Sequence, residues 1–273
     1  NIVGPPLGAL LLSVLPLHGM MAIDVCTAAL AILGLLFVAI PQPEPHSASA
    51  GGIAATLWQD FRTGLRYIHA WSGLFWLTVL SGVTCIAFVP AFSLLPLLVT
   101  QHFGGQALEL GWLSSAYGVG YVLGGIALSA WGAQRRRIVL VLITWIAQGV
   151  AVAAMATVPR QAFPLALGCW FVMGATLAMQ LGALFALLQA NVAPAMQGRV
   201  FTLFMSMNTI ATPLGLAFAG PVADALGIRA WFVIGGVVTV VTGAVQFFMP
   251  AVMRLDDGHP AASAAASAAA PAP

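Results

Sequence analysis

The sequence has very little charge. Charged residues make up 6% of its 273 residues, and because lysine is absent every basic side chain is an arginine. Soluble globular domains carry about 25% charged residues. Hydrophobic residues reach 61% here, so an ordinary soluble fold is excluded. The net charge is only +2 and the arginines are spread over several loops, which argues against nucleic-acid binding.

Cysteine is scarce and catalytic motifs are lacking. Cys26, Cys85 and Cys169 are single and far apart, so they form neither a disulfide framework nor a metal-ligand spacing. The sequence contains no Gly-x-Ser-x-Gly elbow, no His-Glu-x-x-His and no phosphate-binding Gly-Lys-Ser loop. We therefore predict no metal site, no cofactor, no enzyme activity and no ATP-driven pump.

Long apolar stretches dominate the chain instead. A bilayer core about 30 Å thick requires about 20 apolar residues per helix. Eight stretches fit this length, at 1–17, 20–40, 73–100, 109–133, 138–158, 162–191, 200–226 and 230–253. They predict an all-α membrane protein of about eight transmembrane helices. Because the first stretch begins without an initiator Met or flanking charge, we expect the chain to be a fragment.

Polar residues divide the chain into four predicted parts. The parts are two helices over 1–40, a central cytoplasmic loop over 41–72, six helices over 73–253 and a disordered cytoplasmic tail over 254–273. The loop opens with a proline-rich run. Apolar residues then recur at helical spacing from Leu57 to Ile68, which predicts an amphipathic helix on the membrane surface. A short soluble linker helix explains the same pattern.

The arginines predict the orientation in the membrane. If the first span runs outward from the cytoplasm, only Arg160 and Arg229 fall outside the cell. Cytoplasmic loops of membrane proteins carry an excess of Lys and Arg. We therefore predict a cytoplasmic C-terminus.

Small residues form stripes along three predicted helices. The stripes are Gly174, Ala178, Gly182, Ala186 and Ala190; Ala211, Gly215, Ala219 and Ala223; and the pair Gly120 and Gly124. Small residues let membrane helices approach closely. The stripes therefore predict a tight bundle rather than a binding site.

Glycine and proline cluster in two spans that occupy equivalent places when six-helix repeats are counted from the central loop. The residues are Gly4, Pro5, Pro6 and Gly8 in the first span and Pro213 and Gly215 in the seventh. Proline bends a helix, and glycine allows close approach. We predict a conformational role for these residues, with a simple packing kink as the alternative.

Polar residues inside the predicted spans are the candidates for binding and coupling. Asp24 lies about one turn inside its span, where it is either a proton-binding carboxylate or an interfacial acid that reaches water. The uncharged candidates for lining a cavity are Tyr117, Tyr121, Gln148, Gln180 and Asn208. Interhelical hydrogen bonding explains the uncharged residues equally well.

Several short motifs point to one family. They are Gly198-Arg199-Val200-Phe201, Thr212-Pro213-Leu214-Gly215, the run from Gly220 to Gly227, and Gly4-Pro5-Pro6-Leu7-Gly8. Together they resemble the major facilitator superfamily, specifically the macrolide-efflux-like branch of drug:proton antiporters, up to about residue 253. The resemblance implies a major facilitator-type bundle in which the helices present correspond to helices 5–12 of a twelve-helix transporter.

A cytoplasmic loop signature of this superfamily is present in part. The matching residues are Gly125, Gly132, Arg135, Arg136 and Arg137. Ser129 stands where an Asp is usual. The resemblance implies that these matching residues, Arg199 and the Gly/Pro clusters take part in gating.

The resemblance also implies a function. We expect proton-coupled export of an apolar or amphipathic, macrolide-like molecule by alternating access, across the plasma membrane of a bacterium and energised by the proton gradient. The implied partners are the bilayer, the substrate and the preceding helices of the same transporter. An uptake permease for a small metabolite and a non-transporting membrane scaffold of the same fold are the alternatives.

Overall fold

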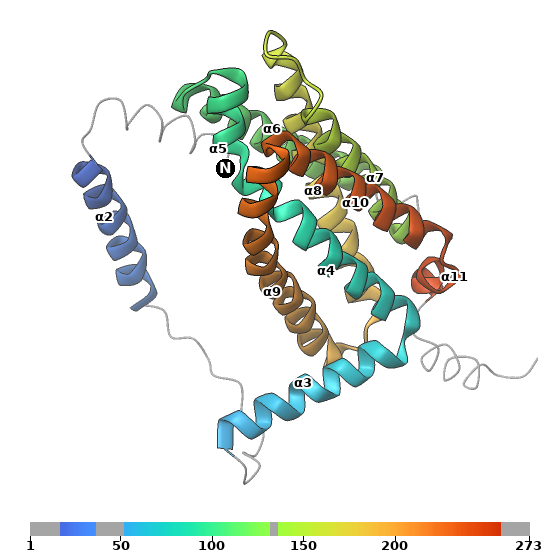
Figure 1. Ribbon diagram of the computed structural model, residues 1–273. Helices are drawn as coiled ribbons and strands as arrows, with labels where there is room; N and C mark the ends of the chain where they lie inside the picture. The colour runs from blue at the N-terminus through green and yellow to red at the C-terminus, as the bar shows by residue number, and fades with distance from the viewer. Residues whose placement is uncertain (1–16, 37–51, 132–135, 258–273) are drawn as a thin grey trace, which may run out of the picture.

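The computed structural model describes residues 17–36, 52–131 and 136–257, and these residues form helices joined by short turns, with no strand among them (Figure 1). The long helices are α2 (Leu17–Leu36), α3 (Gly52–Ala70), α4 (Ser72–Ser93), α6 (Ala107–Trp131), α7 (Arg137–Met155), α8 (Phe163–Asn191), α9 (Pro194–Leu226) and α10 (Ile228–Phe248). The short ones are α5 (Leu95–Leu98), η1 (Val99–Phe103), α11 (Pro250–Met253) and η2 (Arg254–Asp257).

Six helices are long and apolar enough to cross a membrane: α4, α6, α7, α8, α9 and α10. They fall on the six spans predicted after the central loop, and the prediction of an all-α membrane bundle is confirmed. Of the two earlier spans, α2 covers most of the second, and residues 1–16 of the first lie outside the described part of the chain.

Two helix boundaries differ most from the sequence prediction. The span predicted over 73–100 ends as α4 at Ser93, and the chain continues through α5 into a π-helical turn, η1. Pro96 at the start of α5 has no backbone N–H to donate to the preceding turn, so the helix is interrupted there. In contrast, α9 begins at Pro194 rather than near 200, because proline is well tolerated in the first turn of a helix.

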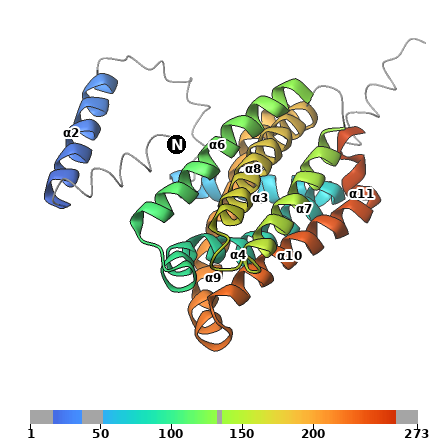
Figure 2. The ribbon, with the colours of Figure 1, turned by 90° about the horizontal axis from the view of Figure 1, so that it is seen from above.

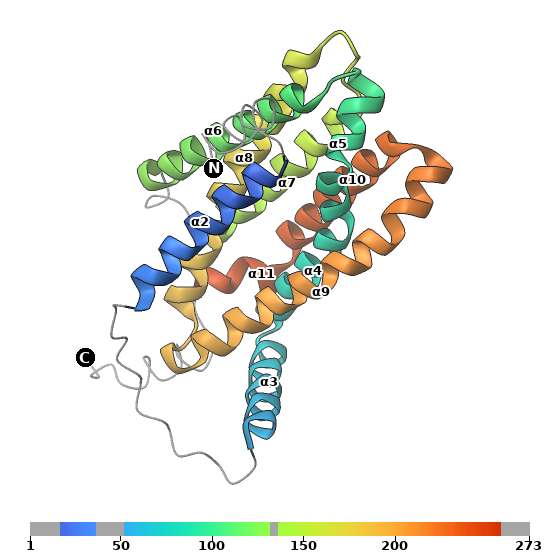
Figure 3. The same cartoon turned by 90° about the vertical axis from the view of Figure 1, so that its left-hand side faces the viewer.

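The long helices alternate in direction, which gives the bundle two distinct ends. At one end, α3 lies across the start of α9 (Figures 1 and 3). We call this the α3 end, and η2 and the start of α7 lie there too. The opposite end, here the far end, holds η1, the α7–α8 turn and the α9–α10 turn. Seen from above, α6 packs on α8, α8 on α7 and α7 on α10 (Figure 2).

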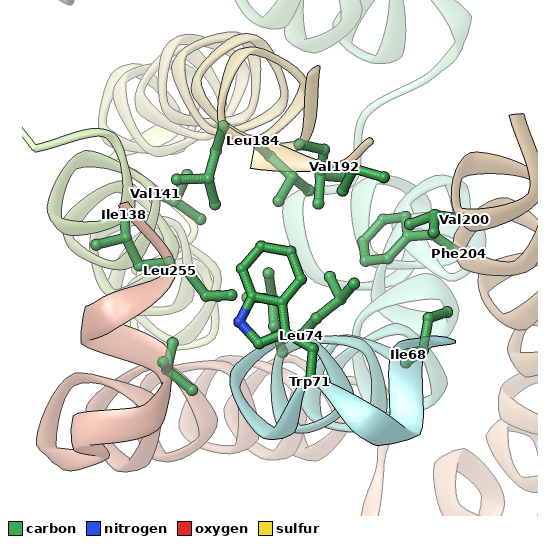
Figure 4. Close-up of a cluster of buried hydrophobic side chains, with 14 of the residues drawn as sticks. Ile68, Trp71, Leu74, Ile138, Val141, Leu184, Val192, Val200, Phe204 and Leu255 are labelled. Atoms are coloured by element: carbon green, nitrogen blue, oxygen red, sulfur yellow. The ribbon is translucent and has the colours of Figure 1, made fainter. Parts of the chain in front are cut away.

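The core consists of two apolar clusters at different depths. The cluster nearer the α3 end surrounds Trp71 and includes Leu74, Ile138 and Leu184 (Figure 4). The cluster nearer the far end is built from other parts of the same helices, including Leu98, Met155, Trp170 and Phe232.

A layer of buried polar side chains lies between the two clusters along α4, α7, α8 and α10. Its members are Thr78, Ser81, Thr84, Thr144, Gln148, Thr176, Gln180, Thr239, Thr242 and Gln246. The hydroxyls mostly donate to carbonyls of their own helix, and Thr84 and Thr242 also share a 2.7 Å hydrogen bond that joins α4 to α10. Self-satisfied hydroxyls make such a layer compatible with a membrane interior.

Glycines bring the backbones of α6 and α8 into contact. A Cβ at Gly120 or Gly124 would meet the carbonyl of Phe171 or Ala175, and a Cβ at Gly174 would meet the carbonyl of Tyr117. The close packing predicted from these stripes is confirmed at this crossing. Ala186 and Ala190, at the other end of the α8 stripe, are exposed instead.

This crossing generates a prediction from two adjacent glycines of α6. Gly124→Ala should lower the free energy of unfolding by about 1–3 kcal/mol, because the added methyl overpacks α6 against α8. Gly125→Ala is the matched control, since a Cβ at Gly125 meets nothing within 4 Å. It should be neutral or stabilise by up to about 1 kcal/mol through helix propensity. SDS titration in detergent micelles measures both, and equal losses would contradict the tight crossing.

Candidate functional site

The candidate coupling residue, Asp24, lies on α2. That helix stands apart from the bundle of six long helices (Figures 1 and 2). The structure therefore does not bring Asp24 together with the predicted cavity residues on α6, α7, α8 and α9. Its role stays a prediction.

Tyr117 and Tyr121 lie one turn apart on α6, with ring centroids 6.3 Å apart. Tyr117 also meets the ring of Phe92 on α4 edge-on at 5.5 Å, and Phe92 in turn lies 5.3 Å from Trp170 on α8. Tyr121 is 38% exposed. The pair therefore belongs to an aromatic cluster that joins three helices in the far half of the bundle. Phe92 and Trp170 were not singled out from the sequence.

The three predicted amide side chains take different positions. Gln148 and Gln180 are buried in the polar layer of the core, and the Oε1 atom of Gln180 has no hydrogen-bond partner among the described residues. Asn208 is half-buried on α9, where its Nδ2 donates to the carbonyl of Phe204 at 2.7 Å. The backbone carbonyl of Asn208 accepts a hydrogen bond from the thiol of Cys85 on α4 at 3.5 Å. These positions fit interhelical packing, the alternative reading of the same residues.

A groove between α8 and α9 is a candidate for binding a small molecule. Its volume is about 590 Å³, and its lining residues are Phe185, Phe201, Thr202, Met205, Ser206, Thr209 and Ile210. The rings of Phe185 and Phe201 span the two helices at 5.5 Å. No charged side chain is among the residues that line it. We call this feature the α8–α9 groove.

The groove results from the different residues on the two faces of α9. Thr202, Ser206 and Thr209 recur at a spacing that places them on one helix face. Another face carries Gly215, where a Cβ would meet the carbonyl of Ile86, so α9 packs tightly on α4 rather than on α8. From the spacing of these hydroxyl residues, the α9 side of the groove could have been predicted. Phe185, from a different helix, gave no such signal.

The groove lies in the half of the bundle nearer α3. Apolar, uncharged pockets with a few polar groups suit ligands that are themselves largely apolar. The hydroxyls can accept or donate hydrogen bonds without the desolvation cost of an ion. The arrangement can hold an amphipathic molecule.

Two of the gating candidates, Arg136 and Arg137, lie at the start of α7, at the α3 end. Arg137 donates from Nη1 to the carbonyl of Ala186 at 3.1 Å, which ties the start of α7 to α8. Arg136 is exposed beside it, and the backbone N–H of Ile138 donates to Asp256 Oδ2 at 3.3 Å. The chain after α10 is thereby fastened to the start of α7.

The remaining gating candidates differ in their surroundings. Arg199 lies where α9 crosses α3. Its Cβ is 3.3 Å from the place that a Cβ would take at Gly64 on α3. Pro213 is exposed inside α9, whereas Gly215 is buried against α4. Gly125 is exposed, and a Cβ there would meet no atom of the described residues within 4 Å. Gly4, Pro5, Pro6, Gly8, Gly132 and Arg135 lie outside the described residues.

Arginines concentrate at the α3 end. Of the described arginines, Arg62, Arg66, Arg136, Arg137, Arg199 and Arg254 lie there. Arg160 and Arg229 lie at the far end, where each donates to a backbone carbonyl. Within the described part of the chain, His, Cys, Asp and Glu form no group of three that could hold a metal ion.

Known proteins resemble this chain over most of its length. Macrolide efflux protein A of Streptococcus pyogenes is 27% identical over 255 residues, which cover 93% of this chain and 62% of that protein. Macrolide efflux protein A of Enterococcus faecalis is 28% identical over 215 residues, covering 79% and 66%. Multidrug efflux pump Tap of Mycolicibacterium fortuitum is 27% identical over 259 residues, covering 93% and 61%. The chain thus spans about three fifths of the length of the first and third of these relatives.

The sequence profile of the Major Facilitator Superfamily matches residues 79–273, a region that holds most of α4 and all of α6 to α10. These are the six helices that can cross a membrane, and they form the bundle that the sequence predicted. The chain belongs to the Major Facilitator Superfamily.

Proposed function

We propose that this chain is part of a secondary transporter that exports apolar or amphipathic small molecules from a bacterial cell by proton-coupled alternating access. The family membership supports transport, and the efflux proteins among its relatives support export. Major facilitator transporters bind substrate near the middle of the membrane between two halves that rock against each other. The six-helix bundle would be one half, and helices from the rest of the transporter would complete the other.

The observation that carries this proposal is the uncharged lining of the α8–α9 groove. A permease for a charged metabolite needs a charged ligand in its core, because an ion without a partner is costly to bury. The groove instead offers two phenylalanines and three hydroxyls. This composition favours a largely apolar substrate, which partitions into the membrane and can enter the groove from it.

The orientation we propose puts the α3 end in the cytoplasm of the cell. The excess of arginines at that end supports it, since basic residues concentrate on the cytoplasmic side of bacterial plasma-membrane proteins. The groove then lies in the cytoplasmic half of the membrane. An exporter needs its binding site accessible from that half in one of its two states.

Energised efflux from cells tests the function. The full-length protein would be expressed in a drug-sensitive bacterium, and efflux of a panel of macrolides and lipophilic dyes would be followed with and without a protonophore. We expect export of at least one panel member, abolished by the protonophore. Net accumulation would favour uptake, and no flux above the empty vector would favour a non-transporting scaffold.

Filling the groove should block export. Ser206→Phe puts a large ring between α8 and α9, and we expect export of the panel substrate to fall at least 10-fold at unchanged membrane protein level. Val241→Phe on α10 is the control, since Val241 is exposed and does not line the groove. Undiminished export by the Ser206 variant would show that substrate binds elsewhere.

Proton coupling is tested at Asp24. Asp24→Asn cannot exchange a proton, so we expect it to insert normally but to lose most protonophore-sensitive export. Asp24→Glu keeps a carboxyl group and should retain a substantial part of the protonophore-sensitive export. Export by the Asn variant at the native rate would assign coupling to another residue, and Asp24 would then be an interfacial acid.

A further inference from the structure

A second groove lies on the outer surface of the bundle, between α7 and α8 in its far half. Its volume is about 730 Å³, and it is lined almost wholly by apolar atoms. The lining residues are Ala147, Val150, Ala151, Ala154, Thr157, Val158, Pro159, Pro164, Leu165, Gly168, Cys169 and Val172. None of them belongs to the α8–α9 groove, and we call this feature the α7–α8 groove.

The groove exists because small residues stand where a lipid-facing helix pair usually carries large ones. Its floor includes alanines of α7 and Gly168 of α8, and a Cβ at Gly168 would meet nothing within 4 Å. Val150 and Leu165 on its walls are 54% and 60% exposed, so the groove opens away from the bundle. On a helix pair that crosses the membrane, that side faces lipid.

The groove lies within one leaflet of a bilayer. On α7 the lining residues run from Ala147 to Ala154, and Thr157 and Val158 continue the groove into the α7–α8 turn. Seven helical steps at 1.5 Å each span about 10 Å. The hydrocarbon core is about 30 Å thick, so each leaflet contributes about 15 Å. The groove therefore accommodates the part of a lipid chain that lies next to the headgroup.

A positive charge stands at this end of the groove. Arg160 directly follows Pro159 in the α7–α8 turn and is exposed. Its Nη2 donates to the carbonyl of Gln101 on η1 at 3.1 Å, which holds the side chain at the far end of the bundle. A guanidinium has five N–H donors, which suit the oxygens of a phosphate. The N-terminus of α8, at Phe163 beside the mouth, adds a partial positive charge.

We propose that the α7–α8 groove binds an anionic phospholipid of the leaflet at the far end, with one acyl chain along the groove and the phosphate at Arg160. The apolar lining suits an acyl chain, and the short length of the groove limits the site to one leaflet. The arginine explains a preference for negative charge. The bound lipid would fill the space left by the small residues and support the packing of α7 on α8, independently of what the transporter exports.

Native mass spectrometry of the full-length protein tests the proposal. The protein would be released from detergent micelles after addition of phosphatidylglycerol or phosphatidylcholine with identical chains. We expect one tightly bound phosphatidylglycerol, with an affinity about 10-fold above that of phosphatidylcholine. Arg160→Gln should remove this preference and leave weaker binding of both lipids. Equal binding of the two lipids by the native protein would overturn the headgroup site.

Groove-filling variants locate the binding. Gly168→Phe occupies the groove with a ring and should abolish the tight binding of phosphatidylglycerol. Gly220→Phe on α9 is the matched control, because a Cβ there also meets nothing within 4 Å and the position does not line the groove. Tight binding by the Gly168 variant equal to that of the native protein would overturn the proposal.

Cys169 gives a second measurement that needs no change in the groove. With Cys26, Cys85 and any cysteine outside this chain replaced by serine, Cys169 is the cysteine left, and it lines the groove. Phosphatidylglycerol should slow its reaction with N-phenylmaleimide at least 5-fold, and phosphatidylcholine should slow it less. Protection by an apolar dye but not by phosphatidylglycerol would overturn the lipid assignment and identify the groove as a site for apolar solutes.

Discussion

Helices in a bilayer gain little by burying apolar side chains against each other, since lipid tails are as apolar as leucine. What holds them together is close contact between backbones, and that contact needs residues without bulky side chains. In this protein the contact is made at Gly120, Gly124 and Gly174. At each of these glycines a backbone carbonyl of the facing helix, α6 or α8, occupies the space that a Cβ would need. The other helix positions depend on this crossing, because α8 also carries α7 and one wall of each groove.

The same principle separates α9 from α8. Gly215 lies close to the carbonyl of Ile86 on α4, so α9 packs on α4 rather than on α8. The wider space left between α8 and α9 is the α8–α9 groove, and Phe185 and Phe201 meet across it. The position of small residues thus decides both which helices touch and where a cavity opens. Binding would then depend on residues that are not themselves in contact with a ligand.

The polar layer in the core shows the other side of the membrane constraint. Hydroxyls of Thr78, Thr144 and Thr239 donate to carbonyls of their own helices, so they cost little when buried. The amide oxygens of Gln180 and Gln246 are buried without a partner in the described structure. A buried acceptor without a partner costs about 1–3 kcal/mol. The six-helix bundle tolerates that cost in its middle while its two apolar clusters pack above and below.

The sequence by itself determined the class of the protein, the six spans after the central loop and the family. It could do so because transmembrane length and the scarcity of charge are local properties, readable from Ser72 to Phe248 one helix at a time. It also predicted that Gly174 and Gly215 pack closely, because their spacing follows the helix period. The tertiary structure alone decided which helices pair. It buried Gln148 and Gln180 in the core and placed Phe185 opposite Phe201. It also left open space at the position of a Cβ on Gly125. A groove between helices requires residues distant in sequence to meet, and no periodicity within one helix encodes that meeting.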